Sequence, residues 1–460
     1  MNNTVVFDSK LIRRYDKSGP RYTSYPTAVQ FSEDFTAADY RCQALASNSN
    51  PSPLSLYFHI PFCAKVCFYC GCSKIVTANR KRALPYLQRL YREIELQAGL
   101  FDRNRPVAQL HWGGGTPTFL NHDQMIELMR VTAEHFNLLD HDRGEYSIEL
   151  DPRELRTDTI ALLRNLGFNR LSLGVQDFDP IVQRAVNRVQ AFSLVESAVN
   201  AARAQGFKSI SFDLIYGLPC QRVESFDNTL ERVIELGPDR LSVFNYAHLP
   251  ALFKVQRQID GNQIPSAKTK LEILQHVIQR LTAVGYVYIG MDHFARPYDE
   301  LALAQQQGRL QRNFQGYSTH ADCDLIGLGM TSIGKVAACY SQNAKTLDAY
   351  YTALDNGELP IQRGIVLTAD DRLRREVISE LICHGELNFT AIENVHHIRF
   401  QNYFADELRR LAVMEKDGLL HLAGDGISIN PSGRLLSRTI CMVFDRYLQQ
   451  QSEQRFSKII

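Results

Sequence analysis

Residues 160–175 read IALLRNLGFNRLSLGV and contain the pattern that decides the fold. Ile160, Leu163 and Leu166 recur at three-residue spacing, which is typical of the apolar face of a helix. Gly167 then permits the left-handed backbone that ends a helix, and residues 170–175 have the short apolar composition of a buried strand. The stretch therefore predicts a helix, a glycine stop, a short turn and a strand in that order.

The same order recurs along the chain, because glycine ends three more helical stretches just before a strand, at Gly206, Gly237 and Gly285. The expected strands are Leu54–Ile60, Gln109–Trp112, Tyr146–Leu150, Arg170–Val175, Ser209–Ile215, Arg240–Tyr246 and Tyr286–Gly290. Repeated βα units build a parallel sheet, so six or seven of them predict an α/β fold with a partial or complete parallel barrel. An open doubly wound sheet is the alternative.

Two regions lie outside these repeated βα units. Residues 1–53 form an irregular, aromatic extension that ends in the linker-like NSNPSP. After Gly364 the sequence predicts helices over 370–384 and 400–416, two short strands around the Gly-Asp-Gly turn of GLLHLAGDGISINPSGR, and a last helix. We therefore expect three parts: an extension over 1–53, a barrel with a following segment over 54–364, and a helical, winged-helix-like domain over 365–460.

Composition excludes several classes of protein. The chain has 460 residues, 45% hydrophobic and 22% charged, which suits two or three globular domains and argues against disorder. Lys and Arg total 51 against 50 Asp and Glu, and so small an excess argues against nucleic-acid binding, including by the winged-helix-like part. The sequence also lacks an apolar run of the roughly 18 residues that a membrane span needs, and its start is too charged for a signal peptide. We expect a cytosolic protein, and a monomer because nothing reads as a coiled coil.

Four of the ten cysteines are clustered in HIPFCAKVCFYCGC, residues 59–72, directly after the first predicted strand. A structural zinc site usually has two pairs of ligands separated by a longer segment, whereas here all the thiols are local. The spacing of Cys63, Cys67 and Cys70, with Cys72 only one residue beyond, favours an iron–sulfur cluster with three thiolate ligands and one open iron. The single cysteines are interpreted as buried small apolar residues: Cys42, Cys220, Cys323, Cys339, Cys383 and Cys441.

A second motif, HWGGGTPTFL at residues 111–120, follows the second predicted strand. Three consecutive glycines allow the backbone to approach a ligand closely and to present its N–H groups to a carboxylate. An ordinary tight turn is the alternative interpretation. The motif lies at the carboxyl end of a predicted strand, and parallel barrels have their catalytic residues at that end.

The cysteine spacing, with Tyr69 before the last ligand, resembles the radical S-adenosylmethionine superfamily. The resemblance covers nearly the whole chain and is to the family of oxygen-independent coproporphyrinogen III oxidases, also called coproporphyrinogen dehydrogenases. It rests on SGPRYTSYPTA, LSLYFHIPFCAKVCFYCGCSKIVT, LHWGGGTPT, IELDPREL, FNRLSLGVQDF, FDLIYGLP, PDRLSVFNYAHLP, YIGMDHFARP and RNFQGYSTH.

The resemblance implies a radical oxidoreductase of haem biosynthesis that decarboxylates two propionates of coproporphyrinogen III to vinyls, giving protoporphyrinogen IX. It also implies a [4Fe–4S] cluster on Cys63, Cys67 and Cys70, and a low-potential electron donor. The alternative within the superfamily is a haem chaperone, which generally lacks the long extension and has Phe where this chain has Cys72. A metal-stabilised regulator without catalytic activity is the alternative from another class.

Site residues follow from the same resemblance, which implies two S-adenosylmethionine molecules per chain. Contacts to the first are Tyr57, Gly114, Glu149 and Ile333, and contacts to the second are Tyr69, Gly115, Thr116, Gln176, Arg188, Asp213 and Ala247. Phe314 and Gln315 match a segment near the substrate, and Cys72 is expected to assist proton or hydrogen transfer. Weaker expectations concern His293 and Arg296 as substrate or structural groups, and Arg21, Tyr22 and Tyr25 in an extension that covers the active site.

Overall fold

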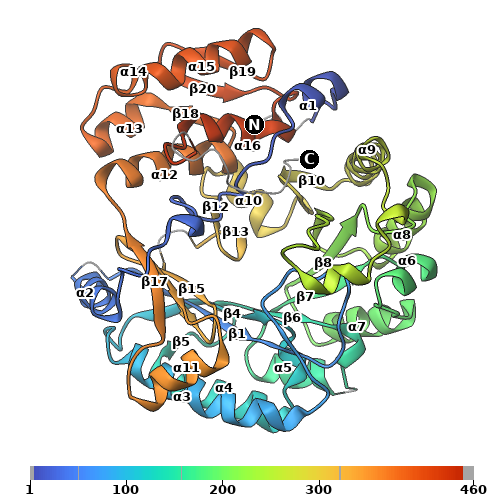
Figure 1. Cartoon of the computed structure of the whole chain (residues 1–460), viewed down its shortest axis with the longest axis vertical. Coiled ribbons are helices and arrows are strands. Elements are labelled where there is room, and N and C mark those ends of the chain that lie inside the picture. The colour runs from blue at the N-terminus through green and yellow to red at the C-terminus, as the bar shows by residue number, and fades with distance from the viewer. Residues whose placement is uncertain (1–4, 50, 157, 321–322, 449–460) are drawn as a thin grey trace. The chain divides into compact units, whose positions relative to one another are not determined.

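The computed structural model describes residues 5–49, 51–156, 158–320 and 323–448, and the chain divides into two compact units (Figure 1). The sheet unit consists of Phe31–Ile273 and Asp322–Val366. The terminal unit consists of Met1–Gln30, Leu274–Ala321 and Leu367–Ile460. The N-terminal extension is thus shared between the two units, with the division after Gln30.

The sheet unit is built on parallel strands, in the spatial order β9-β8-β7-β6-β4-β1-β14. These strands are β1 (Leu54–Ile60), β4 (Pro106–Gly114), β6 (Glu145–Leu150), β7 (Arg170–Gln176), β8 (Ser209–Tyr216), β9 (Arg240–Asn245) and β14 (Asp324–Leu328). Six of them match predicted strands, and the partial parallel barrel of an α/β protein is confirmed. The parallel strand β14, on the far side of β1 from β4, was not predicted.

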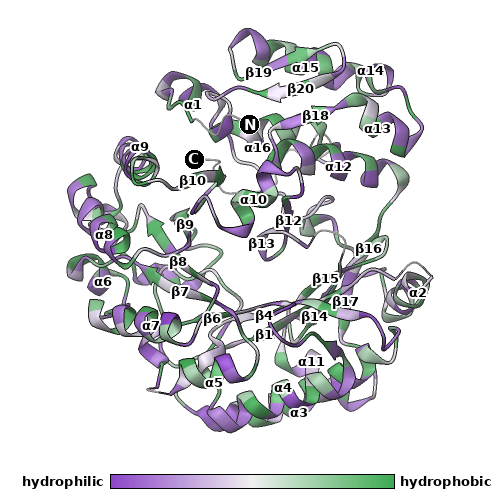
Figure 2. Ribbon diagram, turned by 180° about the vertical axis from the view of Figure 1, so that it is seen from behind, coloured by the Kyte–Doolittle hydropathy of each residue, from purple (hydrophilic) through white to green (hydrophobic). Residues whose placement is uncertain are grey.

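Helices connect the parallel strands and bury one face each. They are α3 (Ala83–Ala98), α4 (His122–His135), α5 (Thr159–Asn165), α6 (Pro180–Ala185), α7 (Phe192–Ala204), α8 (Val223–Leu236) and α9 (Ala267–Ala283). Gly167, Gly206, Gly237 and Gly285 all have positive φ, from 57° to 94°, as the predicted helix stops require. Figure 2 shows helices such as α7 and α8 with both hydrophobic and hydrophilic residues, which is the amphipathic pattern that marks them in the sequence.

Antiparallel strands continue the sheet beyond β14. They are β15 (Ile333–Val336), β16 (Cys339–Asn343) and β17 (Ile361–Val366), with α11 (Leu347–Asp355) between the last two. Helix α2 (Ala37–Ser47) packs against this part of the sheet and begins with a capping box between Thr36 and Asp39. The second part of the N-terminal extension is therefore an integral layer of the sheet unit.

The terminal unit combines helices with short strands that pair antiparallel. Its helices are α1 (Ser9–Tyr15), α10 (Glu300–Gln306), α12 (Ala369–Cys383), α13 (Phe389–His396), α14 (Phe400–Tyr403), α15 (Ala405–Lys416) and α16 (Ser437–Cys441). Its strands are β10 (Val287–Gly290), β11 (His293–Ala295), β12 (Gln311–Asn313), β13 (Gly316–Ser318), β18 (Glu386–Asn388), β19 (Leu420–Ala423) and β20 (Gly426–Ile429). The helices after Gly364 and the β19–β20 hairpin match the sequence expectation, and β18 adds a third strand to that hairpin.

The prediction for Tyr286–Gly290 as a parallel barrel strand was wrong. Strand β10 pairs antiparallel with β11, and the register is irregular between Tyr288 and Gly290. The glycine stop at Gly285 marks a helix end followed by a strand, and this local signal carries no information about the direction of the partner strand.

The prediction that all six single cysteines are buried was correct for four of them. Cys42 is exposed because it lies on the outer face of α2, whose inner face buries Tyr40 and Ala44. Cys220 is partly exposed in the loop after β8, where its thiol donates to the side-chain oxygen of Gln263 at 3.1 Å.

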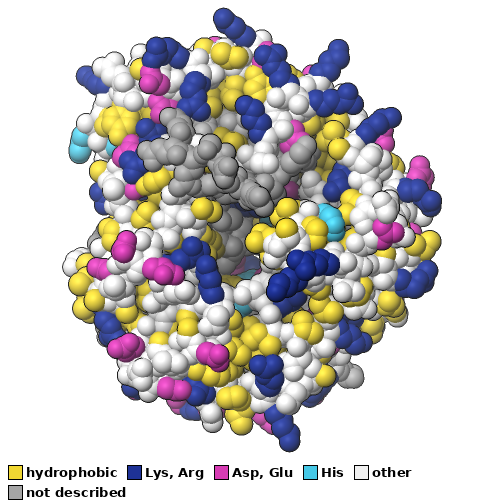
Figure 3. Space-filling view, in the orientation of Figure 1, with side chains coloured by type: hydrophobic (Ala, Val, Ile, Leu, Met, Phe, Trp, Pro, Cys, Tyr) yellow, Lys and Arg dark blue, Asp and Glu magenta, His cyan; other side chains and the backbone are white. Residues whose placement is uncertain are grey.

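Charged side chains of both signs are interspersed on the face shown in Figure 3. This mixture agrees with the near-equal totals of 51 basic and 50 acidic residues. Among the described helices, none combines the length and the apolar character needed to cross a bilayer.

Candidate active site

The cysteine loop follows β1 and is closed by a short parallel ladder. Strand β2 (Phe62–Cys63) pairs with β3 (Ile75–Val76), and the Thr77 N–H donates to the Cys63 carbonyl at 2.9 Å. The Cys70 N–H donates to the Cys67 carbonyl at 3.2 Å, which forms a turn between these two cysteines. The ladder and the turn hold the thiols of one loop at the carboxyl end of the parallel sheet.

The electrostatics of the thiols differ within this loop. Burial raises the pKa of Cys63 to about 12, and the neighbouring thiols of Cys70 and Cys67 act in the same direction. A hydrogen bond from Cys72 lowers the pKa of Cys70 to about 6 against the effect of burial, and the Lys74 ammonium assists. The low pKa favours the thiolate form of Cys70, and the Cys72 thiol lies next to it as a hydrogen-bond donor.

These thiols fit the donor set of an iron–sulfur cluster. Within the ranges that the structure describes, no three His, Cys, Asp or Glu side chains converge on the position of a single metal ion. A four-iron cluster instead takes one thiolate on each ligated iron, and its three protein ligands can come from one loop. Two guanidinium groups also point at the sulfur of Cys67, which is the environment that an anionic thiolate ligand requires.

The two guanidinium groups belong to Arg153 and Arg188. Nη2 of Arg153 lies 3.3 Å and Nη1 of Arg188 lies 3.4 Å from Sγ of Cys67. Asp151 pairs with both arginines, at 2.7 Å to Arg153 and 3.0 Å to Arg188. Arg188 was predicted from the sequence as a site residue. Asp151 and Arg153 were not predicted, although both directly follow the predicted strand 146–150.

Glu149, at the end of β6, faces the triple glycine at the end of β4. Its carboxylate accepts the Gly114 N–H at 3.2 Å and a hydrogen bond from Nε2 of His111 at 3.2 Å. Burial alone would raise the pKa of Glu149, but the hydrogen bonds from His111 and from the Gly114 N–H outweigh it and lower the pKa. Tyr57 stacks on His111 with ring centroids 5.7 Å apart, so these groups form one cluster around the carboxylate.

The end of the triple glycine is close-packed against the backbone of residues 60–62. The N–H groups of Gly115 and Thr116 donate to the carbonyls of Ile60 and Phe62 at 2.8 and 2.9 Å. A Cβ on Gly115 would lie 2.7 Å from the Pro61 and Phe62 carbonyl oxygens. The N–H of Gly115 is thus bonded to a backbone carbonyl, and glycine is needed there because the β4 end loop touches the backbone beneath the cysteine loop.

A second set of predicted residues gathers at the ends of β7 and β8. Gln176 has a left-handed backbone with φ 66°, at an irregularity in the β7–β8 register. A Cβ on Gly174 would lie 2.9 Å from both the Gln176 amide and the Arg188 guanidinium, so these side chains meet over this glycine. Asp213 accepts a hydrogen bond from the Ser172 hydroxyl at 3.2 Å, and burial together with the charge of Glu149 raises its pKa to about 6.

Gln256 links two of the predicted contacts. Its amide donates to the carbonyl of Tyr69 at 3.0 Å and to the carbonyl of Ala247 at 3.2 Å. Its side-chain oxygen accepts the Leu249 N–H at 2.6 Å, and the residue is buried. Gln256 was missed because it lies in a loop segment without a motif.

Ile333 begins β15, and the turn before it is anchored by Glu93 of α3. The buried carboxyl group of Glu93 accepts the Gly329 N–H at 2.7 Å, the Asn343 amide at 2.6 Å and the Tyr350 hydroxyl at 2.5 Å. Burial raises its pKa to about 7, against the effect of these hydrogen bonds. A helical glutamate among apolar residues gives no signal of such a role in the sequence.

The remaining candidate residues belong to the terminal unit. Phe314 and Gln315 form the turn between β12 and β13, and among the described residues the amide nitrogen of Gln315 is buried without a hydrogen-bond partner. His293 packs edge-on against Tyr317. Arg296 stacks on Tyr286 at 4.0 Å and donates to the Val284 carbonyl at 3.0 Å, so its contacts are structural.

The terminal unit contains the three candidate residues of the N-terminal extension, which are Arg21, Tyr22 and Tyr25. Arg21 forms an ion pair with Asp292. Tyr22 and Tyr25 are 4% and 1% exposed, and the Tyr22 hydroxyl donates to Asp445 at 3.1 Å. Tyr22 and Tyr25 therefore belong to a core with the C-terminal segment.

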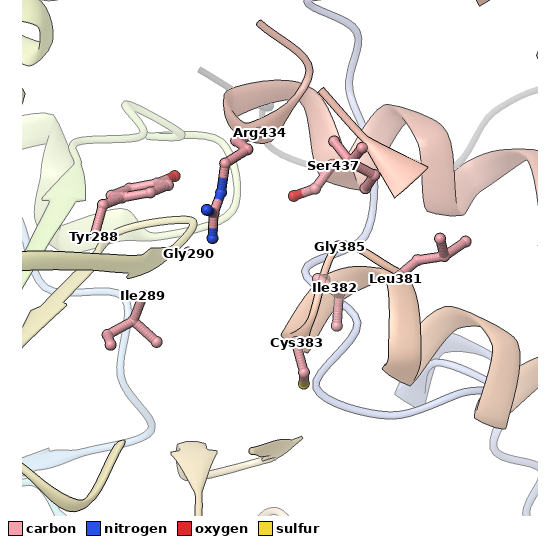
Figure 4. A pocket seen from close by; sticks show the side chains of 10 residues that line it. Tyr288, Ile289, Gly290, Leu381, Ile382, Cys383, Gly385, Arg434 and Ser437 are labelled. Carbon is pink, nitrogen blue, oxygen red and sulfur yellow. The ribbon is translucent and has the colours of Figure 1, made fainter. Parts of the chain in front are cut away.

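A small pocket in the terminal unit is shown in Figure 4. It lies between β10, the end of α12 and the segment that begins α16, and Tyr288 and Arg434 lie side by side in it. Burial lowers the pKa of Arg434. The pocket shares no residue with the site predicted from the sequence.

Two family models match the chain. The model of the radical SAM superfamily matches residues 57–233, which include the cysteine loop, the triple glycine, Glu149 and Arg188. The model of the HemN C-terminal domain matches residues 367–436 of the terminal unit.

Several relatives match over the full length. The oxygen-independent coproporphyrinogen III oxidase of Pseudomonas aeruginosa is 55% identical over 460 residues and covers 100% of both chains. The protein of the same name from Escherichia coli is 52% identical over 457 residues and covers 99% of each chain. A solved structure of coproporphyrinogen III oxidase (HemN) from Escherichia coli, described as a radical SAM enzyme, aligns with a TM-score of 0.92 at 51% identity, covering 96% of this chain and 100% of that chain.

Proposed function

Because this chain belongs to the family of oxygen-independent coproporphyrinogen III oxidases, we propose that it converts coproporphyrinogen III to protoporphyrinogen IX in haem biosynthesis. In this reaction two propionate side chains become vinyl groups. Each ionised propionate side chain loses one hydrogen atom from the carbon next to the pyrrole, carbon dioxide from its carboxylate, and one electron. This proposal rests on the cysteine loop, Glu149 and the arginines, which lie at neighbouring carboxyl ends of parallel strands. Together they suit a radical reaction that begins at an iron–sulfur cluster.

Cys63, Cys67 and Cys70 would hold the cluster, and one iron would remain free of protein ligands. When bound, the [4Fe–4S] cluster supplies the electron that splits S-adenosylmethionine into methionine and a 5′-deoxyadenosyl radical, which takes a hydrogen atom from the propionate carbon next to the pyrrole. Cys72 would not be a ligand in this scheme. Its thiol, beside Cys70, would donate a proton or a hydrogen atom.

The cluster of groups around Glu149 would bind the first S-adenosylmethionine, with Tyr57, Gly114 and Ile333 as further contacts. A carboxylate that stays ionised can accept hydrogen bonds from an ammonium or a hydroxyl group. Its lowered pKa supports this role, as does the tight packing that holds the triple glycine beside it.

We further propose a second S-adenosylmethionine site with Tyr69, Gly115, Thr116, Gln176, Arg188, Asp213 and Ala247 as contacts. The meeting of Gln176 and Arg188 over Gly174, and the Gln256 bridge between Tyr69 and Ala247, support a common pocket. Nε of Arg188 is buried without a partner among the described residues, which suits a donor to a ligand carboxylate.

Phe314 and Gln315 are proposed to contact the porphyrinogen, and the unpaired amide of Gln315 supports a polar contact there. We also propose that the chain acts as a cytosolic monomer and receives electrons from a low-potential donor. All ten cysteines are free thiols, as a reducing compartment would keep them. The well-mixed charge supports the absence of a nucleic-acid partner.

An anaerobic assay of the iron-reconstituted chain tests the proposal. Dithionite, S-adenosylmethionine and coproporphyrinogen III are added, and the products are identified by mass spectrometry. We expect protoporphyrinogen IX together with methionine and 5′-deoxyadenosine. A Cys63→Ala variant should lose iron and both activities, whereas a Cys72→Ser variant should keep its iron and form less product.

Two results would contradict the proposal. Cleavage of S-adenosylmethionine with the porphyrinogen unchanged would assign another substrate. Tight binding of haem without turnover would favour a haem chaperone, although the relatives that match over the full length carry the name of the oxidase.

A further inference from the structure

The ion-pair cluster of Asp151, Arg153 and Arg188 surrounds one cysteine and not the others. Arg153 and Arg188 donate to Sγ of Cys67 at 3.3 and 3.4 Å, and among the described residues these are their hydrogen bonds to the cysteine loop. The side chains of Arg153 and Arg188 are each 8% exposed, and that of Asp151 is 12% exposed. Water therefore screens these charges weakly, and their effect at the sulfur is larger than at a surface.

Asp151 fixes both arginines through separate contacts. It is the N-cap of the turn after β6, and its Oδ1 accepts both the Arg153 N–H and Nε of Arg153 at 3.0 Å. Its Oδ2 accepts Nη2 of Arg153 at 2.7 Å and Nη1 of Arg188 at 3.0 Å. The second terminal nitrogen of the Arg188 guanidinium, Nη2, donates to the Gly174 carbonyl at 2.5 Å. The geometry at the sulfur is thus set by a rigid, three-residue arrangement.

The arrangement carries a net charge of +1 from two arginines and one aspartate. Three thiolates on a [4Fe–4S] core of charge +2 give −1, and a one-electron reduction makes the charge −2 without forming or breaking a bond. A positive charge beside a ligand sulfur stabilises the more negative, reduced state, and hydrogen bonds to sulfur act in the same direction. Loss of one arginine should therefore make the cluster harder to reduce.

We propose that Arg153, held in place by Asp151, is a positioning residue that raises the reduction potential of the cluster through its hydrogen bond to Cys67. The electron comes from a low-potential one-electron carrier, for which dithionite substitutes in the test. This inference rests on the proposed function, because it requires the cluster at Cys63, Cys67 and Cys70. It adds a residue that contacts neither S-adenosylmethionine nor substrate in that proposal.

The test is a redox titration of the full chain with a reconstituted cluster. Iron and sulfide are quantified, and the reduced cluster is followed by electron paramagnetic resonance at set potentials. Arg153→Met should shift the midpoint to a more negative value, and Arg153→Lys, which keeps the charge, should shift it less. Arg164→Met is the matched control, because Arg164 also pairs with an aspartate at 2.6 Å, but that Asp142 precedes β6, at the opposite end of the strand from Asp151.

A double-mutant cycle tests the role of Asp151. In an Asp151→Asn background, Arg153→Met should shift the midpoint less than in the native background, because Arg153 is then no longer held against the sulfur. Additive shifts would remove Asp151 from the proposal.

The outcomes separate this inference from the proposed function. A native chain that forms no cluster would contradict the proposed function itself. If the native chain forms a cluster and Arg153→Met leaves its midpoint potential unchanged, as the Arg164→Met control does, the inference alone is overturned. If Arg153→Met does not retain four irons, Arg153→Gln replaces it, and an unchanged midpoint in that variant overturns the inference equally.

Discussion

At the scale of single residues, Glu93 shows how an acidic group far from the cysteine loop supports the site. Its carboxyl group lies in the interior of the sheet unit and holds the turn that leads to Ile333 through the Gly329 N–H and Asn343. Burial raises its pKa from 4.5 to about 7, so the folded chain retains a proton that the unfolded chain releases. Proton binding and folding are therefore linked at this position.

This linkage predicts the direction of a pH effect. Between pH 4.5 and 7 the folded state binds more protons at Glu93 than the unfolded state does, so stability falls as pH rises through this window. The loss amounts to at most about 3 kcal/mol at 1.36 kcal/mol per pKa unit. Urea unfolding at pH 5 and pH 7.5 should show a smaller decrease for Glu93→Gln than for the native chain.

The control for this prediction is Glu127→Gln, because the side chain of Glu127 is 44% exposed and its ion pair is with Arg130 on the helix surface. An equal pH dependence in Glu93→Gln and in the native chain would show that Glu93 is not protonated in the folded state.

At the scale of elements, the end of β4 and the cysteine loop form one packed unit. The triple glycine lets the β4 end loop touch the backbone of residues 60–62, directly before Cys63. Any side chain at Gly115 must displace backbone atoms, which cannot move aside as the end of a flexible side chain can. A substitution there should disturb the cysteine loop without altering any predicted ligand.

We predict that Gly115→Ala destabilises the sheet unit by about 1–3 kcal/mol, the usual cost of overpacking, and weakens binding of S-adenosylmethionine. Thermal unfolding and equilibrium binding measure the two effects. Gly261→Ala is the control, since a Cβ at Gly261 meets no atom within 4 Å. Native stability in Gly115→Ala would show that the two loops can separate easily.

The elements also explain which parts of the structure can be predicted from sequence. The βα units were found because helix periodicity, glycine stops and buried strands are local signals that Gly167 and its counterparts carry. The cysteine spacing identified the loop for the same reason. Three features depend on partners that are distant in sequence: strand β14, the direction of β10 and the contacts of Gln256. No local pattern indicates them.

The same reasoning explains which residues of the site were predicted from the sequence and which were missed. Glu149 and Arg188 stand in segments with recognisable motifs, whereas Glu93 stands on an ordinary amphipathic helix. Asp151 and Arg153 could have been found from their place after a strand, because side chains at the carboxyl ends of parallel strands meet at one edge of the sheet.

At the scale of the whole molecule, the terminal unit joins the first thirty residues of the chain to the last segment. Arg438 donates to the carbonyl of Pro20 at 2.9 Å, and the Arg446 N–H donates to the Tyr25 hydroxyl at 3.2 Å. Tyr22 and Tyr25 share one hydrophobic core with Phe400 and other residues of the C-terminal segment. The stability of the C-terminal segment should therefore depend on the N-terminal residues.

We predict that Tyr25→Ala destabilises the terminal unit by about 3–5 kcal/mol, the cost of deleting a large buried aromatic side chain. Limited proteolysis with mass spectrometry should detect faster cleavage within residues 367–448. The visible absorption of the cluster in the sheet unit should persist. Tyr298→Ala is the control, because Tyr298 is 67% exposed, and equal cleavage of both variants would contradict the prediction.

The division of the chain into two units also bears on the order in which it is made. The chain passes from one unit to the other after Gln30, Ile273, Ala321 and Val366. During synthesis the ribosome releases the N-terminal aromatic residues first, while the segment that covers them, from Leu367 onward, emerges last. The aromatic residues of this charged N-terminal segment are therefore synthesised long before their core partners, and the terminal unit can complete its core only after the whole sheet unit has been translated.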